Sequence, residues 1–206
     1  MSGLFPFLPV FVDLAGRAAV LLSGAGELAP IARRLLDAGA GVTVVDQEMS
    51  VAMEELGPSM RLLRRHWRPL DMTGAALVVA GPAEARPARA RAAAKAAGAI
   101  FTMSGASDRS EVIFGAAAAW GPVAIGVAAS GLAPSLGEAM ARRLEAAVPA
   151  SYAGFLAAAA RMGAEIDRKI TDHANREAFW RAAAADAFDA SPGDPSGWDA
   201  WLKARL

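Results

Sequence analysis

Cysteine is absent from the 206-residue chain. A disulfide framework, a thiolate zinc site and a cysteine nucleophile are therefore excluded. At this length a chain forms a stable core, or a domain with a smaller appendage, without cross-links. Histidine is also scarce, since only His66 and His173 are present. We therefore expect no resident metal site.

Net charge is absent too, because 21 Lys and Arg balance 21 Asp and Glu. Such a chain has no overall field to attract nucleic acid or an anionic membrane, so an anionic ligand needs a local basic patch. No run reaches the roughly 18 apolar residues of a membrane helix. The apolar start MSGLFPFLPVFVDLAG has two prolines, Asp13 and no basic leader, unlike a signal peptide. We expect a soluble, cytoplasmic protein that binds neither nucleic acid nor membrane.

The first half of the chain alternates short β-branched runs with helical stretches rich in Ala and Arg. This alternation is typical of βαβ units and predicts an α/β fold with a Rossmann-like parallel sheet. We expect strands near Ala18–Leu22, Val42–Val45, Met60–Leu63, Ala76–Ala80 and Ile100–Met103. We expect helices at about Glu27–Ala38, Ser50–Leu56 and Ala83–Ala97, with Gly39 and Gly98 in left-handed C-terminal caps.

The pattern changes after residue 111. Two strand-like runs, Val112–Ala117 and Val123–Ala128, flank Trp120-Gly121-Pro122 and predict an antiparallel hairpin. A helix over 133–148 should follow, and the rest should be helical apart from a breaker at 189–197. We expect a Rossmann-like domain at 1–110, a strand-helix dimerisation region at 111–148 and a helical domain at 149–206. The apolar character of 112–132 favours a homodimer.

A glycine turn follows the first predicted strand. Residues 24–29 read GAGELA, a G-x-G-x-x-A pattern whose glycines allow a tight turn and close approach to a pyrophosphate. Asp46 stands twenty residues after Gly26, where a carboxylate accepts the ribose hydroxyls of NAD and repels an extra phosphate. The candidate cofactor-binding residues are Gly24, Ala25, Gly26, Glu27, Leu28, Asp46 and Gln47.

A purely structural interpretation of the same turn stays open. Strand-to-helix turns in α/β sheets favour glycine in any case, and Asp46 is then an ordinary acid at the end of a strand. Two features weaken an anion site: Pro30 is expected to remove an N–H from the first helical turn, and Glu27 places a negative charge there.

Three segments carry a resemblance to a known family: FPFLPVFVDLAGRAAVLLSGAG (5–26), VAIGVAASGLAPSLGEAMARRLEAAVP (123–149) and REAFW (176–180). Together they resemble the precorrin-2 dehydrogenase family, the N-terminal module of siroheme synthase, over approximately residues 5–186. The resemblance implies a Rossmann domain, a dimerisation region and a helical domain. It also implies NAD-dependent oxidation of precorrin-2 to sirohydrochlorin. Iron insertion, which some members perform, is not expected here.

The family's polar site residues map unevenly onto this chain. Three consecutive glycines of the family fall on Ser23, Gly24 and Ala25 in an ungapped comparison, and a one-residue shift to Gly24–Gly26 stays open. The family's polar pair after the fourth strand is replaced by Gly81-Pro82.

Two further family residues have lost their functional groups. The aspartate that looks like the family's general acid/base falls on Gly105 or Ala106, which leaves Asp108 as the nearest candidate catalytic carboxylate. The serine of a Gly-x-Ser-Pro turn near the tetrapyrrole falls on Ala133.

The substrate implied by the resemblance carries several carboxylates, so its binding needs arginine and lysine gathered locally. The candidate substrate-binding residues are Arg109, Ala133, Arg142, Arg143, Arg161 and Lys169. Each basic residue could equally be a solvated helix or loop residue.

Three functions therefore compete. The first is an NAD-dependent precorrin-2 dehydrogenase that works mainly by proximity. The second is a catalytically impaired tetrapyrrole-binding or regulatory homologue that has lost this chemistry. The third is a nucleotide-binding scaffold with an unrelated small substrate, because a Rossmann sheet alone fixes no chemistry. The glycine turn discriminates between the first two, since only the oxidoreductase needs it to hold a pyrophosphate.

Overall fold

The computed structural model describes residues 7–120, 123–129, 134–189 and 197–206. The chain divides into two compact units. Unit 1 holds the described residues up to Phe114 together with 128–129, and unit 2 holds Gly115–Val127 and the described residues from 134 onward. The finer division into three domains stays a prediction.

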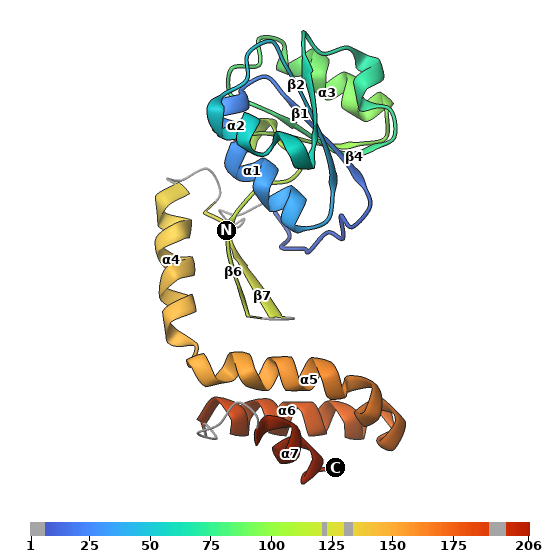
Figure 1. The fold of residues 1–206 in the computed structure, drawn as a ribbon, viewed down its shortest axis with the longest axis vertical. Helices are drawn as coiled ribbons and strands as arrows, with labels where there is room; N and C mark the ends of the chain where they lie inside the picture. Colours follow the sequence, from blue (N-terminus) through green and yellow to red (C-terminus); the bar gives the residue numbers. More distant parts are fainter. Residues whose placement is uncertain (1–6, 121–122, 130–133, 190–196) are drawn as a thin grey trace, which may run out of the picture. The chain divides into compact units, whose positions relative to one another are not determined.

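Unit 1 is built on a parallel sheet of five strands, drawn in Figure 1. The strands are β1 (Ala18–Leu22), β2 (Gly41–Asp46), β3 (Arg61–Arg64), β4 (Ala75–Ala80) and β5 (Ile100–Met103). Their order across the sheet is β3-β2-β1-β4-β5. The chain therefore moves outward from β1 to β3 and returns to the other side of β1 with β4. The predicted α/β Rossmann-like fold is confirmed.

Alternate side chains of β1 enter two separate cores. Ala19 and Leu21 lie in a cluster with the apolar faces of α1 (Ala25–Asp37) and α2 (Val51–Glu55). Val20 and Leu22 lie in a cluster with α3 (Pro87–Ala96). Burial on both faces explains why β1 is a continuous apolar run. The short helices η1 (Gly57–Ser59), η2 (Pro69–Met72) and η3 (Ser107–Arg109) complete the unit.

The strand predicted at Val112–Ala117 is wrong in its position, because the structure places β6 at Ala116–Trp120. Tertiary contacts override the local apolar pattern before Ala116. Glu111 donates its N–H to the carbonyl of Phe101 at 2.9 Å, and Thr102 Oγ1 donates to the carbonyl of Val112 at 2.7 Å. Val112 then packs against the first core. This segment runs beside the sheet of unit 1 instead of entering the hairpin.

Unit 2 begins with the antiparallel hairpin of β6 and β7 (Val123–Val127), followed by α4 (Pro134–Ala147). The predicted turn residues Gly121 and Pro122 lie outside the described residues. Small residues let α4 approach the hairpin closely. Ala118 on β6 and Ala141 on α4 are buried, and a Cβ at Gly137 would lie 3.3 Å from the carbonyl oxygen of Val127.

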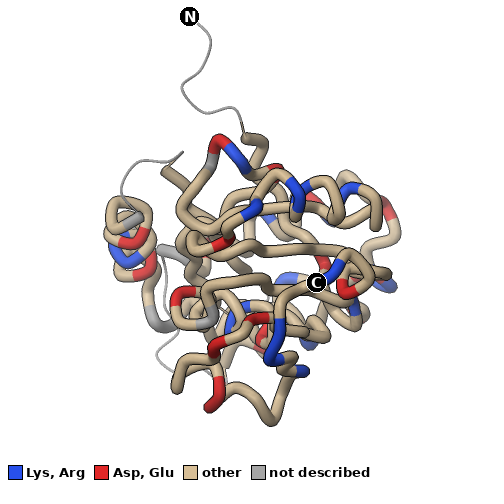
Figure 2. Tube along the Cα trace, turned by 90° about the horizontal axis from the view of Figure 1, so that it is seen from above, with Lys and Arg blue, Asp and Glu red and all other residues tan. Residues whose placement is uncertain are grey.

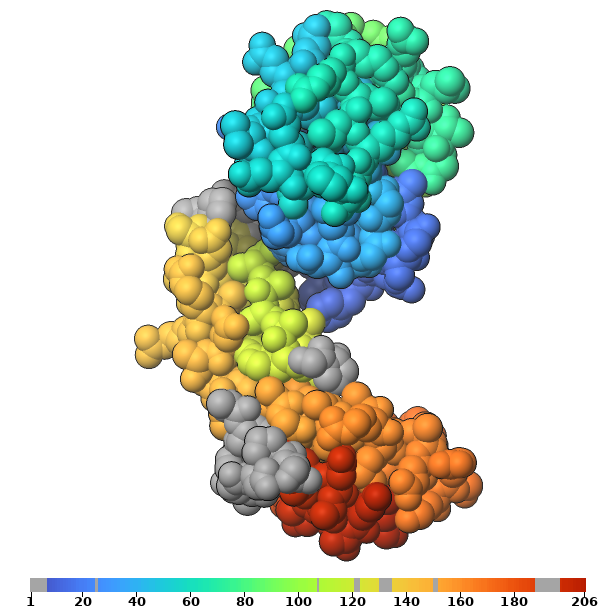
Figure 3. All heavy atoms as spheres, in the orientation of Figure 1, coloured from blue at the N-terminus to red at the C-terminus, as the bar shows by residue number. Residues whose placement is uncertain are grey.

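The remaining helices are α5 (Ala150–Lys169), α6 (His173–Asp189) and α7 (Gly197–Lys203). In Figure 3, α7 (red) lies against α5 (orange), and the two helices are joined by aromatic packing. The rings of Phe155 and Trp198 meet edge to face with their centroids 5.2 Å apart. The buried Ile166 and Leu202 complete this core.

Charge is mixed throughout. Figure 2 shows Lys and Arg interspersed with Asp and Glu along the described chain. Within the described residues, no helix combines the length and the apolar character needed to cross a membrane.

Candidate functional site

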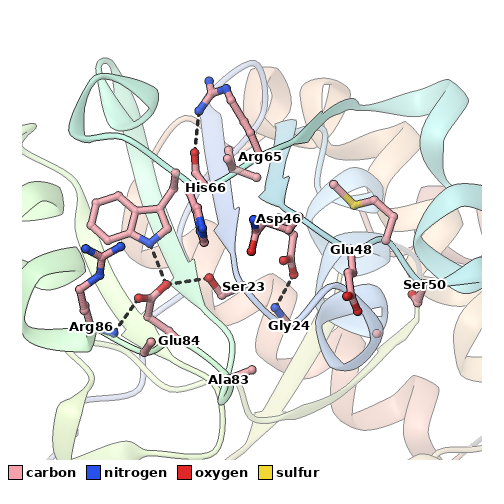
Figure 4. A pocket seen from close by; sticks show the side chains of 16 residues that line it. Ser23, Gly24, Asp46, Glu48, Ser50, Arg65, His66, Ala83, Glu84 and Arg86 are labelled. Carbon is pink, nitrogen blue, oxygen red and sulfur yellow. Dashed lines mark hydrogen bonds between the residues drawn. The ribbon is translucent and has the colours of Figure 1, made fainter.

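A pocket of about 550 Å³ lies at the carboxyl ends of the strands of unit 1 (Figure 4). Its walls come from the residues that follow β1, β2, β3 and β4, which are distant in sequence. The lining residues are Ser23, Gly24, Gly26, Val45–Ser50, Arg65–Trp67 and Ala83–Arg86. The strand order reverses between β1 and β4, and ligands of open α/β sheets bind at such a switch point.

The glycine turn begins one residue earlier than the G-x-G-x-x-A pattern indicates. Ser23 has φ of +48° and Gly24 has φ of +117°, and α1 starts directly after Gly24. The left-handed conformation of Ser23 is one that glycine adopts without steric cost. This agrees with the resemblance, which aligns a family glycine with Ser23.

Gly26 lies in the first turn of α1. Glu27 and Leu28 already donate their N–H groups to the carbonyl of Gly24, both at 3.0 Å. The N–H groups of Ala25 and Gly26 precede these first helical bonds and belong to the open end of the helix. Pro30 lies beyond the first turn, so the expectation that it removes a donor from that turn is wrong.

The turn after β4 lies against the turn after β1. A Cβ at Gly81 would lie 1.8 Å from the carbonyl oxygen of Ser23 and 2.9 Å from the Cα of Gly24. No side chain fits such a gap, so glycine is required here by contact with backbone atoms. Gly81 also donates its N–H to the carbonyl of Leu22 at 2.8 Å, which fixes the two turns together.

Asp46, the last residue of β2, aims its side chain at the glycine turn. Its Oδ2 accepts the backbone N–H of Gly24 at 2.7 Å (Figure 4). The carboxylate is therefore anchored beside the open end of α1. Gln47 follows it and also lines the pocket.

Glu84 is a buried carboxylate on the opposite wall, with 7% of its surface exposed. Its Oε2 accepts the hydroxyl of Ser23 at 2.7 Å and the indole N–H of Trp67 at 2.8 Å. Its Oε1 accepts the backbone N–H of Arg86 at 2.8 Å. One side chain thus joins the ends of β1, β3 and β4. Helix α3 begins at Pro87 and not at the predicted Ala83, because a proline disfavours helical backbone at the residue before it, here Arg86.

An ion pair fixes the end of β3. Arg65 donates from Nη1 and Nη2 to the two carboxylate oxygens of Asp71, at 2.7 and 2.6 Å. These hydrogen bonds, helped by the backbone N–H of Arg68, hold the pKa of the Asp71 carboxyl below its ordinary value despite partial burial. The same pairing raises the pKa of Arg65.

The candidate catalytic carboxylate lies on the surface. Asp108 belongs to η3, its side chain is 79% exposed, and it forms an ion pair with Arg109 at 3.8 Å. Ser110 Oγ holds this loop by accepting the N–H of Met103 at 2.9 Å and donating to the carbonyl of Ala106 at 2.7 Å. Neither Asp108 nor Arg109 lines the pocket. Their predicted roles stay predictions.

The other basic candidates belong to unit 2, where ion pairs engage three of them. Arg142 pairs with Glu138 at 3.9 Å, Arg161 with Asp199 at 3.1 Å and Lys169 with Glu165 at 3.3 Å. Arg143 is exposed on α4, and Ala133 lies outside the described residues. Among the described residues, no three His, Asp or Glu side chains gather as metal ligands would.

The structure brings Gly24, Gly26, Asp46 and Gln47 together in one pocket, as the spacing predicts. Leu28 is instead fully buried in the core. Sequence reasoning missed Glu84, Trp67 and Arg65. Only their position in the sequence could have indicated them. Each follows a predicted strand, and the carboxyl ends of these parallel strands lie at the same edge of the sheet.

Comparison with known proteins agrees with this geometry. Residues 10–116 match a family model described as "Putative NAD(P)-binding". The chain belongs to this family. The resemblance to the precorrin-2 dehydrogenase and siroheme synthase N-terminal module family is confirmed by this match together with the siroheme synthases described next, and the chain is a divergent member.

Individual relatives support the assignment. Siroheme synthase of Ectopseudomonas mendocina is 34% identical over 176 residues, which cover 84% of this chain and 38% of the relative. Siroheme synthase of Tolumonas auensis is 32% identical over 181 residues, which cover 87% of this chain and 38% of the relative. The chain thus spans little more than a third of these relatives.

A solved structure of SirC, a precorrin-2 dehydrogenase, matches this fold. The match has a TM-score of 0.71 at 16% identity and covers 96% of this chain and all of the other. At that identity the match establishes the fold alone.

The contact between the turns predicts that Gly81→Ala destabilises unit 1 by about 3 kcal/mol, because backbone atoms must move to admit the methyl group. Chemical unfolding followed by circular dichroism measures the change. Gly26→Ala is the matched control, since its Cβ would meet Ser50 Cβ at an ordinary 3.6 Å. An alanine in that helix should leave stability unchanged or raise it slightly. Equal stability of the two variants would contradict the account of Gly81.

The Asp71 pair predicts a pH-dependent stability difference between the wild type and Asp71→Asn. The folded-state pKa of Asp71 lies below its unfolded value, so the pair stabilises the protein above the ordinary carboxyl pKa of about 4. That stabilisation is lost as the pH falls through the folded-state value. Melting temperatures should therefore differ by a constant amount near neutrality and converge in acid. A gap that widens in acid would refute this assignment.

Proposed function

We propose that this chain binds NAD at the carboxyl edge of its sheet and oxidises precorrin-2 to sirohydrochlorin in siroheme biosynthesis. The observation that carries the proposal is the pocket at the switch point, where the glycine turn, the open end of α1 and Asp46 converge. A dinucleotide needs these three elements together.

The pocket residues fit the adenosine half of a dinucleotide. Gly24 and Gly26 carry no side chain that would displace a pyrophosphate from the N–H groups at the start of α1. Asp46 is held by Gly24 at the place where a ribose is recognised in such folds. A carboxylate there disfavours the 2′-phosphate of NADP, which supports NAD as the cofactor.

In this proposal the chain contributes mainly the positioning of the cofactor and the substrate. NAD, when bound, accepts a hydride from the substrate, and a proton is released to water. The end of α1 and Asp46 orient the cofactor, so the reaction gains its rate mainly from proximity. Arginine and lysine of unit 2 are the proposed contacts for substrate carboxylates, once they exchange their present ion pairs.

A second function is favoured by the exposed position of Asp108. A general acid/base must lie within hydrogen-bond reach of its proton, and Gly105 or Ala106 stands where the family aspartate aligns. A tetrapyrrole-binding or regulatory homologue without turnover therefore stays the alternative. The cytoplasmic location expected from the sequence also stays a prediction.

We also propose a homodimer formed through α4. Its small residues face the hairpin, whereas Leu136, Met140 and Leu144 follow one another at every fourth position and are 47%, 51% and 45% exposed. A two-stranded hairpin with one helix is marginal in isolation. A second copy of the chain is the proposed cover for this apolar stripe.

The cofactor proposal predicts micromolar binding of NAD in a calorimetric titration. Gly26→Asp should weaken it by more than about tenfold, because a carboxylate then faces the phosphates at the start of α1. Gly163→Asp is the matched control on α5, where a Cβ meets no atom within 4 Å, and it should bind NAD as the wild type does. No binding by the wild type would refute the proposal. If NAD binds but is not reduced to NADH in the presence of precorrin-2, the non-catalytic alternative is favoured instead.

The dimer proposal predicts that the chain sediments as a dimer and that Met140→Lys produces a monomer, because a charge then enters the apolar contact. Leu70→Lys is the control, since Leu70 is 82% exposed on η2 and lies outside α4. A monomeric wild type, or a variant that still dimerises, would disprove this interface.

A further inference from the structure

Arg65 is the pocket-lining cation nearest in the sheet to Asp46. Asp46 pairs with Arg64 across β2 and β3, and neighbouring strands lie about 4.8 Å apart. Arg65 is the next residue after this pair and lines the pocket. A guanidinium in this place is the group that a fold of this type uses to accept the 2′-phosphate of NADP.

The guanidinium of Arg65 is nevertheless held by other partners. It forms the two hydrogen bonds to Asp71 at 2.7 and 2.6 Å and a third to the carbonyl of His66 at 3.0 Å. Figure 4 shows it turned away from Asp46 and toward His66. Asp71 is itself fixed, because it accepts the backbone N–H of Arg68 at 2.7 Å.

Among the described residues on this wall of the pocket, the charged side chains near Asp46 are acidic or already paired. Arg64 forms an ion pair with Glu54 and does not line the pocket. Glu48, which lines the same side as Asp46, is negative. Figure 4 places Arg86 on the opposite wall, beside Glu84. A 2′-phosphate next to Asp46 would therefore meet two carboxylates and a guanidinium that already donates three of its five N–H groups to Asp71 and His66.

We propose that Asp71 is a positioning residue for cofactor choice: by binding Arg65, it withholds the guanidinium from a 2′-phosphate and so makes the pocket selective for NAD over NADP. Asp71 contacts no cofactor in this proposal and acts only through Arg65. The inference rests on the proposed NAD-binding function and assigns part of its selectivity to a residue outside the pocket.

The test is the ratio of the dissociation constants for NADP and NAD, measured by calorimetry. Asp71→Asn keeps an oxygen for the N–H of Arg68 but removes the charge that holds Arg65. We expect this variant to lower the ratio by about tenfold, because NADP binds more tightly. A tenfold change corresponds roughly to the free energy of one hydrogen bond to a charged group. The double variant Asp71→Asn with Arg65→Gln should return the ratio to the wild-type value.

Glu54→Gln is the matched control, because it makes the same change in net charge and frees Arg64 instead. It should leave the ratio unchanged, and an equal shift in this variant would contradict the role of Arg65. A variant Asp71→Asn that is folded, binds NAD and keeps the wild-type ratio overturns the inference alone. Failure of the unsubstituted chain to bind either dinucleotide overturns the proposed function, and the inference with it.

Discussion

The contact between the turns after β1 and β4 is the constraint on which the rest of the site depends. The Cα of Gly81 stands where any side chain would collide with the carbonyl oxygen of Ser23. Because the turns touch, the chain can place Gly24, Asp46 and Glu84 around one pocket. Ser23 adopts a left-handed conformation to make this contact and gains a hydrogen bond from its hydroxyl to Glu84. At Ser23, the strained backbone conformation therefore occurs together with the hydrogen bond that its side chain donates to Glu84.

The parallel sheet could be predicted from the sequence, because strands that are buried on both faces appear there as short apolar runs. The predicted strands at Ala18–Leu22 and Ile100–Met103 coincide with β1 and β5. Gly39 and Gly98 have φ of +76° and +73°, as the predicted helix caps require. Asp46 was predicted as a site residue because the number of residues in a βα unit fixes which strand end meets the glycine turn.

The rest depends on contacts that spacing does not encode. In the sequence, nothing distinguishes Glu84 from an ordinary acidic loop residue. Only the fold brings Ser23 and Trp67 within hydrogen-bond distance of it. The pairing of Arg65 with Asp71 is equally invisible in sequence, although it engages a cation that lines the pocket. The residues around Val112 in the sequence are typical of a strand. Val112 nevertheless lies beside β5 in unit 1, because the Thr102 hydroxyl donates a hydrogen bond to its carbonyl.

The proposed function places a dinucleotide on the turn formed by Ser23 and Gly24, beside Asp46. Hydrogen–deuterium exchange of the whole chain, with and without NAD, tests this claim most directly because it reports which backbone amides the ligand covers. We expect slower exchange in peptides that cover residues 23–28 and 46–50, with exchange in unit 2 unchanged. Protection confined to unit 2, or no protection at saturating NAD, would contradict it.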